Sequence, residues 1–300
     1  INGGYITINE TAMGGQGNSK IYIIYLFPLP TNSGNLTYNI RWELESAPLY
    51  SFSSHTFTNC GVTGRYGPNV TQCQNAYGAS GWWHNTNYFD STTNGTQAWK
   101  CPLTGLYKVT AIGAAGGDWI HNGTTRKLGG HGGKVSHPAI KLIGGHWYWI
   151  LVGQKGTDAT ASSGHAGAGG GGGTFFAKVP RNTTGTFPIQ PSANNRRSWA
   201  EIIMIAGGGG GASGLSGAVA DGRGGWWDRN SPPRAWEPSG PSTITGGAGG
   251  TGGGADYGYN AGGGGSWTNN GGSGGSGGRE GLAFVNGGSG GTASGGTNYQ

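Results

Sequence analysis

Residues 202–211 read IIMIAGGGGG, so an apolar segment rich in isoleucine runs directly into five consecutive glycines. The apolar half is typical of a buried β-strand. The glycine half has no side chains to bury. It would lose about 1 kcal/mol per residue relative to alanine in a helix, and it would gain little from packing in a sheet. The remaining regular conformation is the extended threefold helix, whose backbone groups must pair with neighbouring segments.

Glycine accounts for 69 of the 300 residues and is concentrated in the C-terminal half, where runs recur at 169–173 and 262–265. We therefore predict a bundle of polyglycine-II helices over residues 207–280. The alternative is a set of irregular glycine loops held in place by tryptophan side chains. These tryptophans are Trp226, Trp227, Trp236 and Trp267.

The overall composition excludes several classes of protein. Aromatic residues make up 11% of the chain, which argues against a disordered low-complexity polymer. The chain has 13 prolines and no strict Gly-X-Y period, so it is not collagen. No apolar run approaches the roughly 20 residues of a membrane-spanning helix, so no membrane insertion is expected. The net charge is +6, but the basic residues are scattered, which argues against nucleic acid as a partner.

Short segments with β-forming residues alternate with glycine, proline and asparagine turns over the rest of the chain. No helical period of useful length is present. The sequence therefore predicts an all-β fold, a sandwich or jelly roll. The expected strands are 5–9, 20–27, 36–44, 54–58, 96–101, 105–113, 134–143, 146–152, 173–179, 199–206 and 281–286.

The three cysteines cannot all pair with one another. Cys60 and Cys73 enclose a loop of turn-forming residues, and a disulfide that closes it would stabilise the fold by about 3 kcal/mol. Such a bond implies an oxidising compartment. Cys101 would then be a buried free thiol or an intermolecular bond. Sequons for N-linked glycans occur slightly more often than chance predicts, at Asn9, Asn35, Asn69, Asn94, Asn122 and Asn182.

The segment 56–68, TFTNCGVTGRYGP, followed by Gln72-Cys73, resembles the start of the glycine-rich domain in anaplastic lymphoma kinase and leukocyte tyrosine kinase receptor ectodomains. The order continues with QAWK at 97–100, AIGAAGG at 111–117, ILVGQKG at 150–156 and IIMIAGGGGG at 202–211, and the resemblance covers about residues 51–290. It implies a sandwich similar to tumour necrosis factor, with packed glycine helices inserted before a closing strand at 281–286. It also implies that Cys60 pairs with Cys73.

The chain departs from this pattern in three respects. Cys101 stands where the family commonly has an apolar residue, and the glycine tract lacks the further cysteines of the receptors. No kinase, epidermal-growth-factor module or transmembrane segment is recognisable. Receptor activity is therefore not implied for the whole chain.

Four regions are expected. Residues 1–50 form an N-terminal β extension, residues 51–206 the sandwich with the first glycine segments, residues 207–280 the glycine bundle, and residues 281–300 the closing strand and tail. The segment around Tyr5, Ile6 and Ile8 could pair within its own chain or act as a strand donor to a neighbouring subunit.

No catalytic motif is present, since the histidines are dispersed and glycine-rich matches carry no weight in such a chain. We expect no enzyme activity, no cofactor and no metal. The best site candidates are the pairs Trp82-Trp83 and Trp226-Trp227, which could anchor a protein interface or stack on sugars. The alternative is that they cover hydrophobic edges of the sandwich. Trp147 and Trp149 share one strand face, which favours core packing.

Three functions fit these observations. The first is a secreted structural glycoprotein that self-associates into a filament or matrix, with itself and N-linked glycans as partners. The second is a ligand-binding receptor ectodomain, although the basic polypeptide ligands implied by the resemblance suit a chain of charge +6 poorly. The third is an adhesin or tail-fibre recognition module. All three predict an extracellular location.

Overall fold

The computed structural model describes residues 5–10, 47–64, 66–91, 95–121, 125–161, 167–179, 201–212 and 291–292. Within them the chain is mostly β-strand, as the sequence predicts, and the two larger sheets are antiparallel. The predicted strands at 20–27, 36–44 and 281–286, and residues 213–280 of the predicted glycine bundle, lie outside the described residues. The other predicted strands begin and end within two residues of the observed strands, and the strand at 54–58 has the predicted bounds at both ends.

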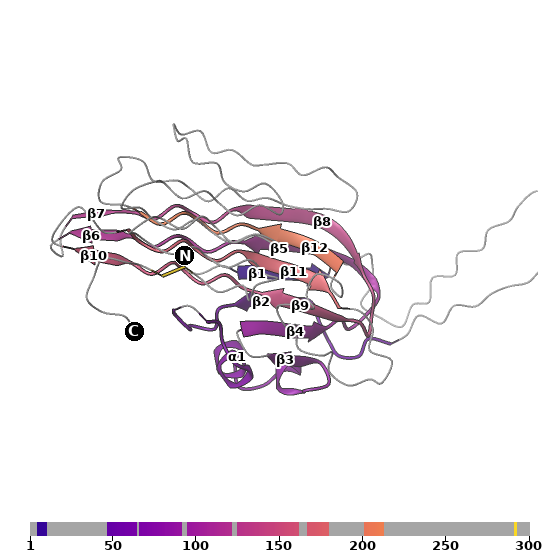
Figure 1. The fold of residues 1–300 in the computed structure, drawn as a ribbon. Helices are drawn as coiled ribbons and strands as arrows, with labels where there is room; N and C mark the ends of the chain where they lie inside the picture. Colours follow the sequence, from indigo (N-terminus) through magenta and orange to yellow (C-terminus); the bar gives the residue numbers. More distant parts are fainter. Residues whose placement is uncertain are drawn as a thin grey trace, which may run out of the picture.

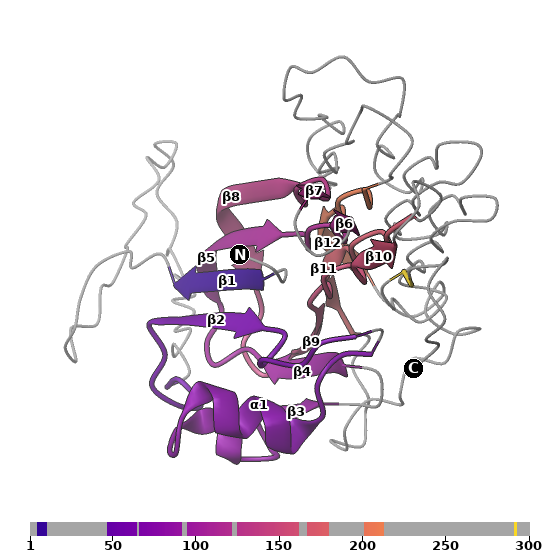
Figure 2. The same cartoon turned by 90° about the vertical axis from the view of Figure 1, so that its left-hand side faces the viewer.

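Two larger sheets face each other (Figures 1 and 2). The first has the order β2 (Ser54–Thr58), β1 (Tyr5–Glu10), β5 (Gly105–Ile112), β8 (Lys134–Leu142). The second has the order β12 (Glu201–Ala206), β11 (Thr174–Lys178), β9 (Trp147–Leu151), β4 (Thr96–Lys100), β3 (Phe89–Ser91). A third, small sheet joins β10 (Ala159–Ala161), β6 (Trp119–His121) and β7 (Thr125–Lys127), and β10 and β6 run parallel.

One apolar core fills the space between the two larger sheets. The first sheet contributes Phe57, Tyr107 and Val109, and the second contributes Trp99 and Tyr148. In β5, buried and accessible residues alternate, because successive side chains of a strand point to opposite faces. This alternation turns one face of β5 toward the core and leaves its other face accessible.

The second sheet is buried on both faces. Tyr148 and Ile150 of β9 join the central core, while Trp149 and Leu151 belong to a second buried cluster with Phe175 of β11. The prediction that Trp147 and Trp149 pack on one face is confirmed, with Trp149 buried and Trp147 partly buried against this second cluster. A strand buried on both faces has a continuous apolar sequence, as WYWIL shows.

Segment β1 lies inside the first sheet, between β2 and β5. Tyr5 is paired with Thr58 on one side and with Ile112 on the other, and both pairings are antiparallel. Of the two alternatives left open by the sequence, the structure therefore shows pairing within the same chain.

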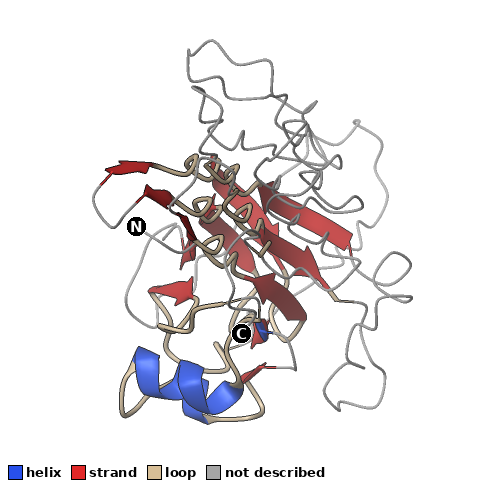
Figure 3. Cartoon of the chain, turned by 60° about the vertical axis from the view of Figure 1, so that its left-hand side comes forward, coloured by secondary structure: helices blue, strands red, loops and turns tan. Residues whose placement is uncertain are grey.

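The expectation of no helix is wrong. A helix, α1 (Val70–Tyr77), and a 3₁₀ turn, η1 (Trp82–His84), cover one edge of the sandwich (Figure 3). The helix begins with a capping box: the side chain of Asn69 accepts from the Gln72 N–H, and the side chain of Gln72 accepts from the Asn69 N–H. This local signal was present in the sequence, but α1 has too little apolar periodicity to be recognised. The strands β3, β6, β7 and β10 were missed because each has three residues.

Glycine-rich segments continue from the sandwich strands and lie side by side toward the small sheet (Figure 1). Their amides pair between segments with a period of three. The N–H groups of Gly113 and Gly116 donate to the segment 129–133, at O···N distances of 2.9 Å. The N–H groups of Ala114 and Gly117 donate instead to the segment 167–173, at 3.0 and 2.9 Å. Each segment therefore meets several neighbours in turn, which a flat sheet cannot do.

The segments approach so closely that side chains cannot be accommodated. A Cβ added to Gly113, Gly116, Gly132, Gly156 or Gly209 would overlap a carbonyl oxygen of a neighbouring segment. Backbone packing of this kind needs glycine for space rather than for unusual dihedral angles, since none of these residues has a positive φ.

A charged cluster closes the end of these segments beside the small sheet. Lys155 forms ion pairs with Asp118 at 3.1 Å and with Asp158 at 2.8 Å. Burial alone would lower the Lys155 pKa, but the hydrogen bonds that Lys155 donates to the two carboxylates outweigh it and raise the pKa. Asp118 also accepts from the Gly129 N–H, so one carboxylate joins three segments.

Candidate functional site

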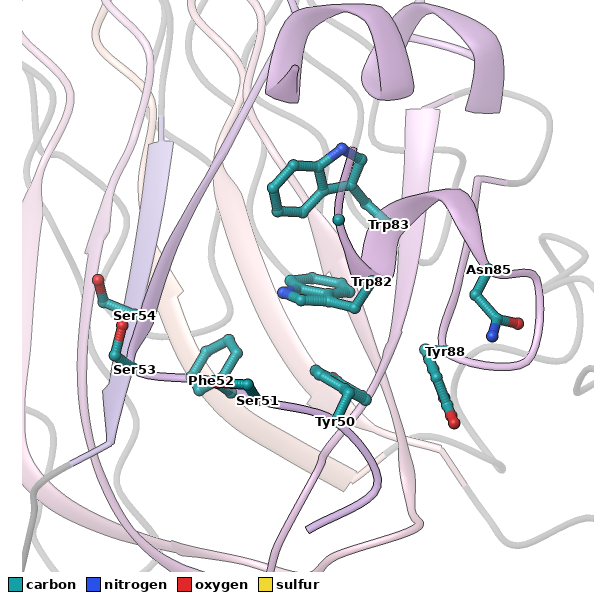
Figure 4. A pocket seen from close by; sticks show the side chains of 10 residues that line it. Tyr50, Ser51, Phe52, Ser53, Ser54, Trp82, Trp83, Asn85 and Tyr88 are labelled. Carbon is teal, nitrogen blue, oxygen red and sulfur yellow. The ribbon is translucent and has the colours of Figure 1, made fainter. Parts of the chain in front are cut away.

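A groove among the described residues lies at the edge of the sandwich beside α1 and η1. It has a volume of about 550 Å³ and is lined by Tyr50, Ser51, Phe52, Ser53, Ser54, Gly81, Trp82, Trp83, Asn85 and Tyr88. Figure 4 shows the aromatic rings in the middle, with Ser53 and Ser54 at one side and Asn85 and Tyr88 at the other. The volume falls within the range of small-molecule sites, about 300–1,000 Å³.

Hydrogen bonds from α1 fix the position of the groove on the sandwich. The Tyr77 hydroxyl donates to Gln97 of β4 at 2.6 Å and accepts from the Thr58 N–H of β2 at 3.0 Å. Gln97 in turn donates to the Thr58 carbonyl at 2.8 Å. The helix is thus tied to both larger sheets.

The turn that carries the tryptophans is held by the C-terminal half of the helix and its cap residue Gly78. The Trp83 indole N–H donates to the Gly78 carbonyl at 3.1 Å, and the Gln74 side chain donates to the Trp83 carbonyl at 3.1 Å. Gly81 makes room for this arrangement, because a Cβ there would lie 2.5 Å from the Trp83 ring. The predicted pair Trp82-Trp83 is therefore a fixed and half-buried part of the groove.

The groove rings form a continuous aromatic cluster. Tyr50 stacks on Trp82, with ring centroids 5.2 Å apart and an interplanar angle of 24°, and it lies 4.6 Å from Tyr88. Phe52 connects Trp82 to the core residue Trp99, at centroid distances of 6.1 and 5.3 Å. Such contacts hold each ring in one orientation.

His55 lies beneath the groove, enclosed by four aromatic rings. Its ring contacts Phe57, Tyr77, Trp82 and Trp83 at centroid distances from 4.5 to 5.4 Å. Burial disfavours the charged imidazolium and lowers the His55 pKa to about 4. The side chain is therefore neutral at physiological pH.

This environment predicts a loss of stability in mild acid. The ordinary His55 pKa of 6.5 applies to the unfolded chain, which therefore binds the proton at higher pH than the folded chain. The contribution of the neutral His55 to stability is fully present above about pH 6.5. The free energy of unfolding then decreases by about 3 kcal/mol as the pH falls toward 4. Urea unfolding at pH 7.0 and 4.5 measures this decrease. The control His55→Phe should show a smaller decrease, and an equal decrease in both proteins would contradict the prediction.

The predicted pair Cys60 and Cys73 lies where the segment after β2 contacts α1. The two sulfurs lie 3.0 Å apart, with both residues as free thiols in the structure. The contact with Cys73 lowers the pKa of Cys60, while the contact with Cys60, and then burial, raises that of Cys73. Since the thiolate is the species that is oxidised, this pair is arranged for disulfide formation.

We expect the oxidised protein to contain the Cys60–Cys73 disulfide and to unfold at higher denaturant concentration than the reduced protein. The difference should be about 3 kcal/mol, because the bond closes a loop of about 13 residues in the unfolded chain. Guanidinium unfolding with and without reductant measures the difference. Reductant should leave the double variant Cys60→Ser, Cys73→Ser unchanged, and a wild type that is equally unaffected would refute the pairing.

Cys101 is fully buried in the core. Its thiol donates to the Leu103 carbonyl at 3.1 Å and contacts the Tyr107 hydroxyl at 3.4 Å. Of the two states expected for Cys101, this environment fits the buried free thiol. An intermolecular disulfide would require the side chain to reach the surface.

The other predicted residues have the following positions. Asn69 is exposed at the start of α1, and its side-chain oxygen serves as the helix cap. Asn9 lies in β1 with Tyr5, Ile6 and Ile8. The residues Asn35, Asn94, Asn122, Asn182, Trp226 and Trp227 lie outside the described residues.

Sequence reasoning missed Tyr50, Phe52, His55 and Tyr88 as residues of this site. They come from the segment before and within β2 and from the segment after η1, so no local motif joins them. Only the aromatic content of 47–57 and 82–89 could have drawn attention to them.

No described helix is long and apolar enough to cross a membrane. No three histidine, cysteine, aspartate or glutamate side chains gather as metal ligands in the part of the chain that the structure describes.

The fold and groove thus define an all-β protein with an aromatic groove at one edge of its sandwich. No family model matches the sequence. Over 121 residues the chain is 37% identical to the leukocyte tyrosine kinase receptor of Mus musculus. The match covers 37% of this chain and 12% of the receptor, so the chain corresponds to a small part of that protein. It supports a relationship to receptor ectodomains and an extracellular or cell-surface location.

Proposed function

We propose that this chain is a non-enzymatic extracellular recognition module, similar to a ligand-binding receptor ectodomain, and that the aromatic groove contacts its ligand. The observation that carries the proposal is the groove itself: half-buried aromatic rings held by hydrogen bonds on a rigid edge of the sandwich. Aromatic side chains with limited freedom bind well because little entropy is lost when they are covered.

The glycine segments would serve this function as a stiff support. We infer that they form a polyglycine-II bundle that extends a sandwich of the tumour-necrosis-factor type, as the resemblance implies. Two observations support this inference: the hydrogen bonds between segments repeat every three residues, and some segments pair in parallel while others pair antiparallel. Segments 113–117 and 167–173 pair antiparallel, since Ala114 and Gly117 donate to Gly172 and Gly169, whereas Gly209 and Ala212 donate in parallel order to Ala114 and Gly117.

The experiment is a saturation-binding measurement of the fluorescently labelled protein on a panel of cultured animal cells. The variants Trp82→Ala and Tyr88→Ala remove rings from the groove, and Leu128→Ala removes an apolar side chain that is 60% exposed and lies beside β7 at the far end of the molecule (Figure 1). We expect saturable binding that weakens at least tenfold in both groove variants and is unchanged in Leu128→Ala.

Circular dichroism and thermal melting establish that each variant is folded before binding is compared. Absence of saturable binding, or equal binding by folded groove variants and Leu128→Ala, would refute the proposal.

The described residues give no support to a self-associating filament. The proposed strand donor β1 is paired on both sides in its own chain. If the chain is a recognition module, light scattering at micromolar concentration should show a monomer. Long polymers in negative-stain micrographs would favour the filament instead.

A further inference from the structure

We propose that the aromatic groove binds a neutral saccharide through pyranose rings that stack on Tyr50 and Trp82. This inference rests on the proposed function, because it assigns a ligand class to the same groove. It is carried by the charge of the lining, by the orientation of the rings and by the polar groups at the two sides.

The charge of the lining selects an uncharged ligand. Among the ten described lining residues none carries a charge at neutral pH. Burial raises the pKa of Tyr50 far above its ordinary value, and its hydroxyl donates to the Lys100 carbonyl. His55 beneath the rings is neutral as well, because its pKa is about 4. A charged ligand would lose hydration in this groove without gaining an opposite charge.

The rings provide flat surfaces of the size of a sugar. The Tyr50 and Trp82 rings are nearly parallel, at 24°, and each covers one face of the other and leaves the opposite face for a ligand, while Trp83 stands at 76° to Trp82 as a side wall. A pyranose with equatorial hydroxyls has C–H groups on its flat faces and hydroxyls around its edge. Such a ring can cover an aromatic face while its hydroxyls remain in contact with polar groups.

Polar groups are available at both sides of the rings. Ser51, Ser53, Ser54 and Asn85 are exposed residues of the lining, and each can donate and accept hydrogen bonds. Figure 4 places Ser53 and Ser54 on one side of the rings and Asn85 on the other. A few polar groups around an apolar floor are the usual composition of a small-molecule site.

A protein partner fits the groove less well. Stable protein interfaces bury about 800 Å² on each side and centre on an exposed apolar patch. Here the rings are half-buried in a hollow of about 550 Å³, and none of them is among the large exposed hydrophobic residues of the described chain. The hollow accommodates a short oligosaccharide rather than a protein surface.

The test titrates the whole protein with cellohexaose and with chitohexaose, which have equatorially substituted, β-linked neutral rings. Heparin hexasaccharide is the charged comparison, and tryptophan fluorescence and calorimetry report binding. We expect saturable binding of at least one neutral hexasaccharide, unchanged between 50 and 500 mM salt because no ion pair is involved, and little binding of heparin.

Three variants in the groove, with one control outside it, connect this binding to the groove. Trp82→Ala should weaken binding of the neutral hexasaccharide at least tenfold, while Trp82→Phe, which retains an aromatic face, should stay within about threefold of wild type. Asn85→Ala tests the polar side of the groove without removing a ring and should weaken binding severalfold. Leu128→Ala should bind as wild type does.

The saccharide assignment is overturned if neither neutral hexasaccharide binds, or if the folded Trp82→Ala variant binds them as tightly as Leu128→Ala. If cell binding still depends on the groove in that case, the recognition function remains and its ligand is of another class. If cell binding is also independent of the groove, both proposals fail.

Discussion

Replacement of Gly209 by alanine should destabilise the protein by about 3 kcal/mol or more, or prevent its folding. The added Cβ would overlap the Gly130 carbonyl oxygen and lie 3.0 Å from the Gly116 nitrogen. Gly209 also donates to the Ala114 carbonyl and accepts from the Gly171 N–H, both at 2.8 Å. The segment cannot move away from the new methyl group without losing these hydrogen bonds, so overpacking and unsatisfied amides add together.

The matched control is Gly105→Ala in β5. A Cβ at that position would meet only the Tyr107 ring, at 3.7 Å, which is an ordinary contact. We expect this variant to stay within about 1 kcal/mol of wild type. Guanidinium unfolding compares the two variants. Equal stability would mean that the glycine segments are not in close backbone contact.

Removal of residues 1–10 should abolish cooperative folding. The deletion removes β1 from the middle of the first sheet and leaves the facing edges of β2 and β5 without hydrogen-bond partners. The total stability of a domain is about 5–15 kcal/mol, which is comparable with the cost of losing an interior strand and its part of the core. Thermal melting by circular dichroism and the yield of soluble protein measure the effect.

A synthetic peptide of residues 1–12 should restore folding when it is added to the shortened chain, because it can pair with both exposed edges. A peptide of the same composition in scrambled order is the control. A shortened chain that melts cooperatively at the wild-type temperature would show that β1 is not an integral part of the sheet. Rescue by the peptide would also show that this segment can pair between chains, which the filament hypothesis requires.

The strands were predictable because their pattern is local. In β9 and β11 the apolar residues are continuous, and in β5 they alternate, so both kinds of strand are recognisable without their neighbours. Helix α1 was missed because it has little apolar periodicity and because Tyr77 holds it through hydrogen bonds to residues of β2 and β4. Those contacts are invisible in a local window.

The candidate site was predictable only in part. Trp82 and Trp83 were chosen because two adjacent tryptophans in a polar segment need an explanation, and the groove contains both. Tyr50 stacks on Trp82 although the two residues are 32 positions apart, so its role depends on the fold. The same holds for His55, whose neutral state follows from rings supplied by β2, α1 and η1.

By itself, the sequence determined that the chain is rich in β-strands and that its glycine tracts need backbone partners, because a residue without a side chain can satisfy only its amide and carbonyl groups. It did not determine which tracts would pair. Only the tertiary structure decided that Gly209 meets Ala114 and Gly171, and that Tyr50, Phe52 and Trp82 meet in one groove. The physical reason is that hydrogen-bond capacity and hydrophobicity belong to each residue, whereas close contact between distant residues arises only when the sheets pack together.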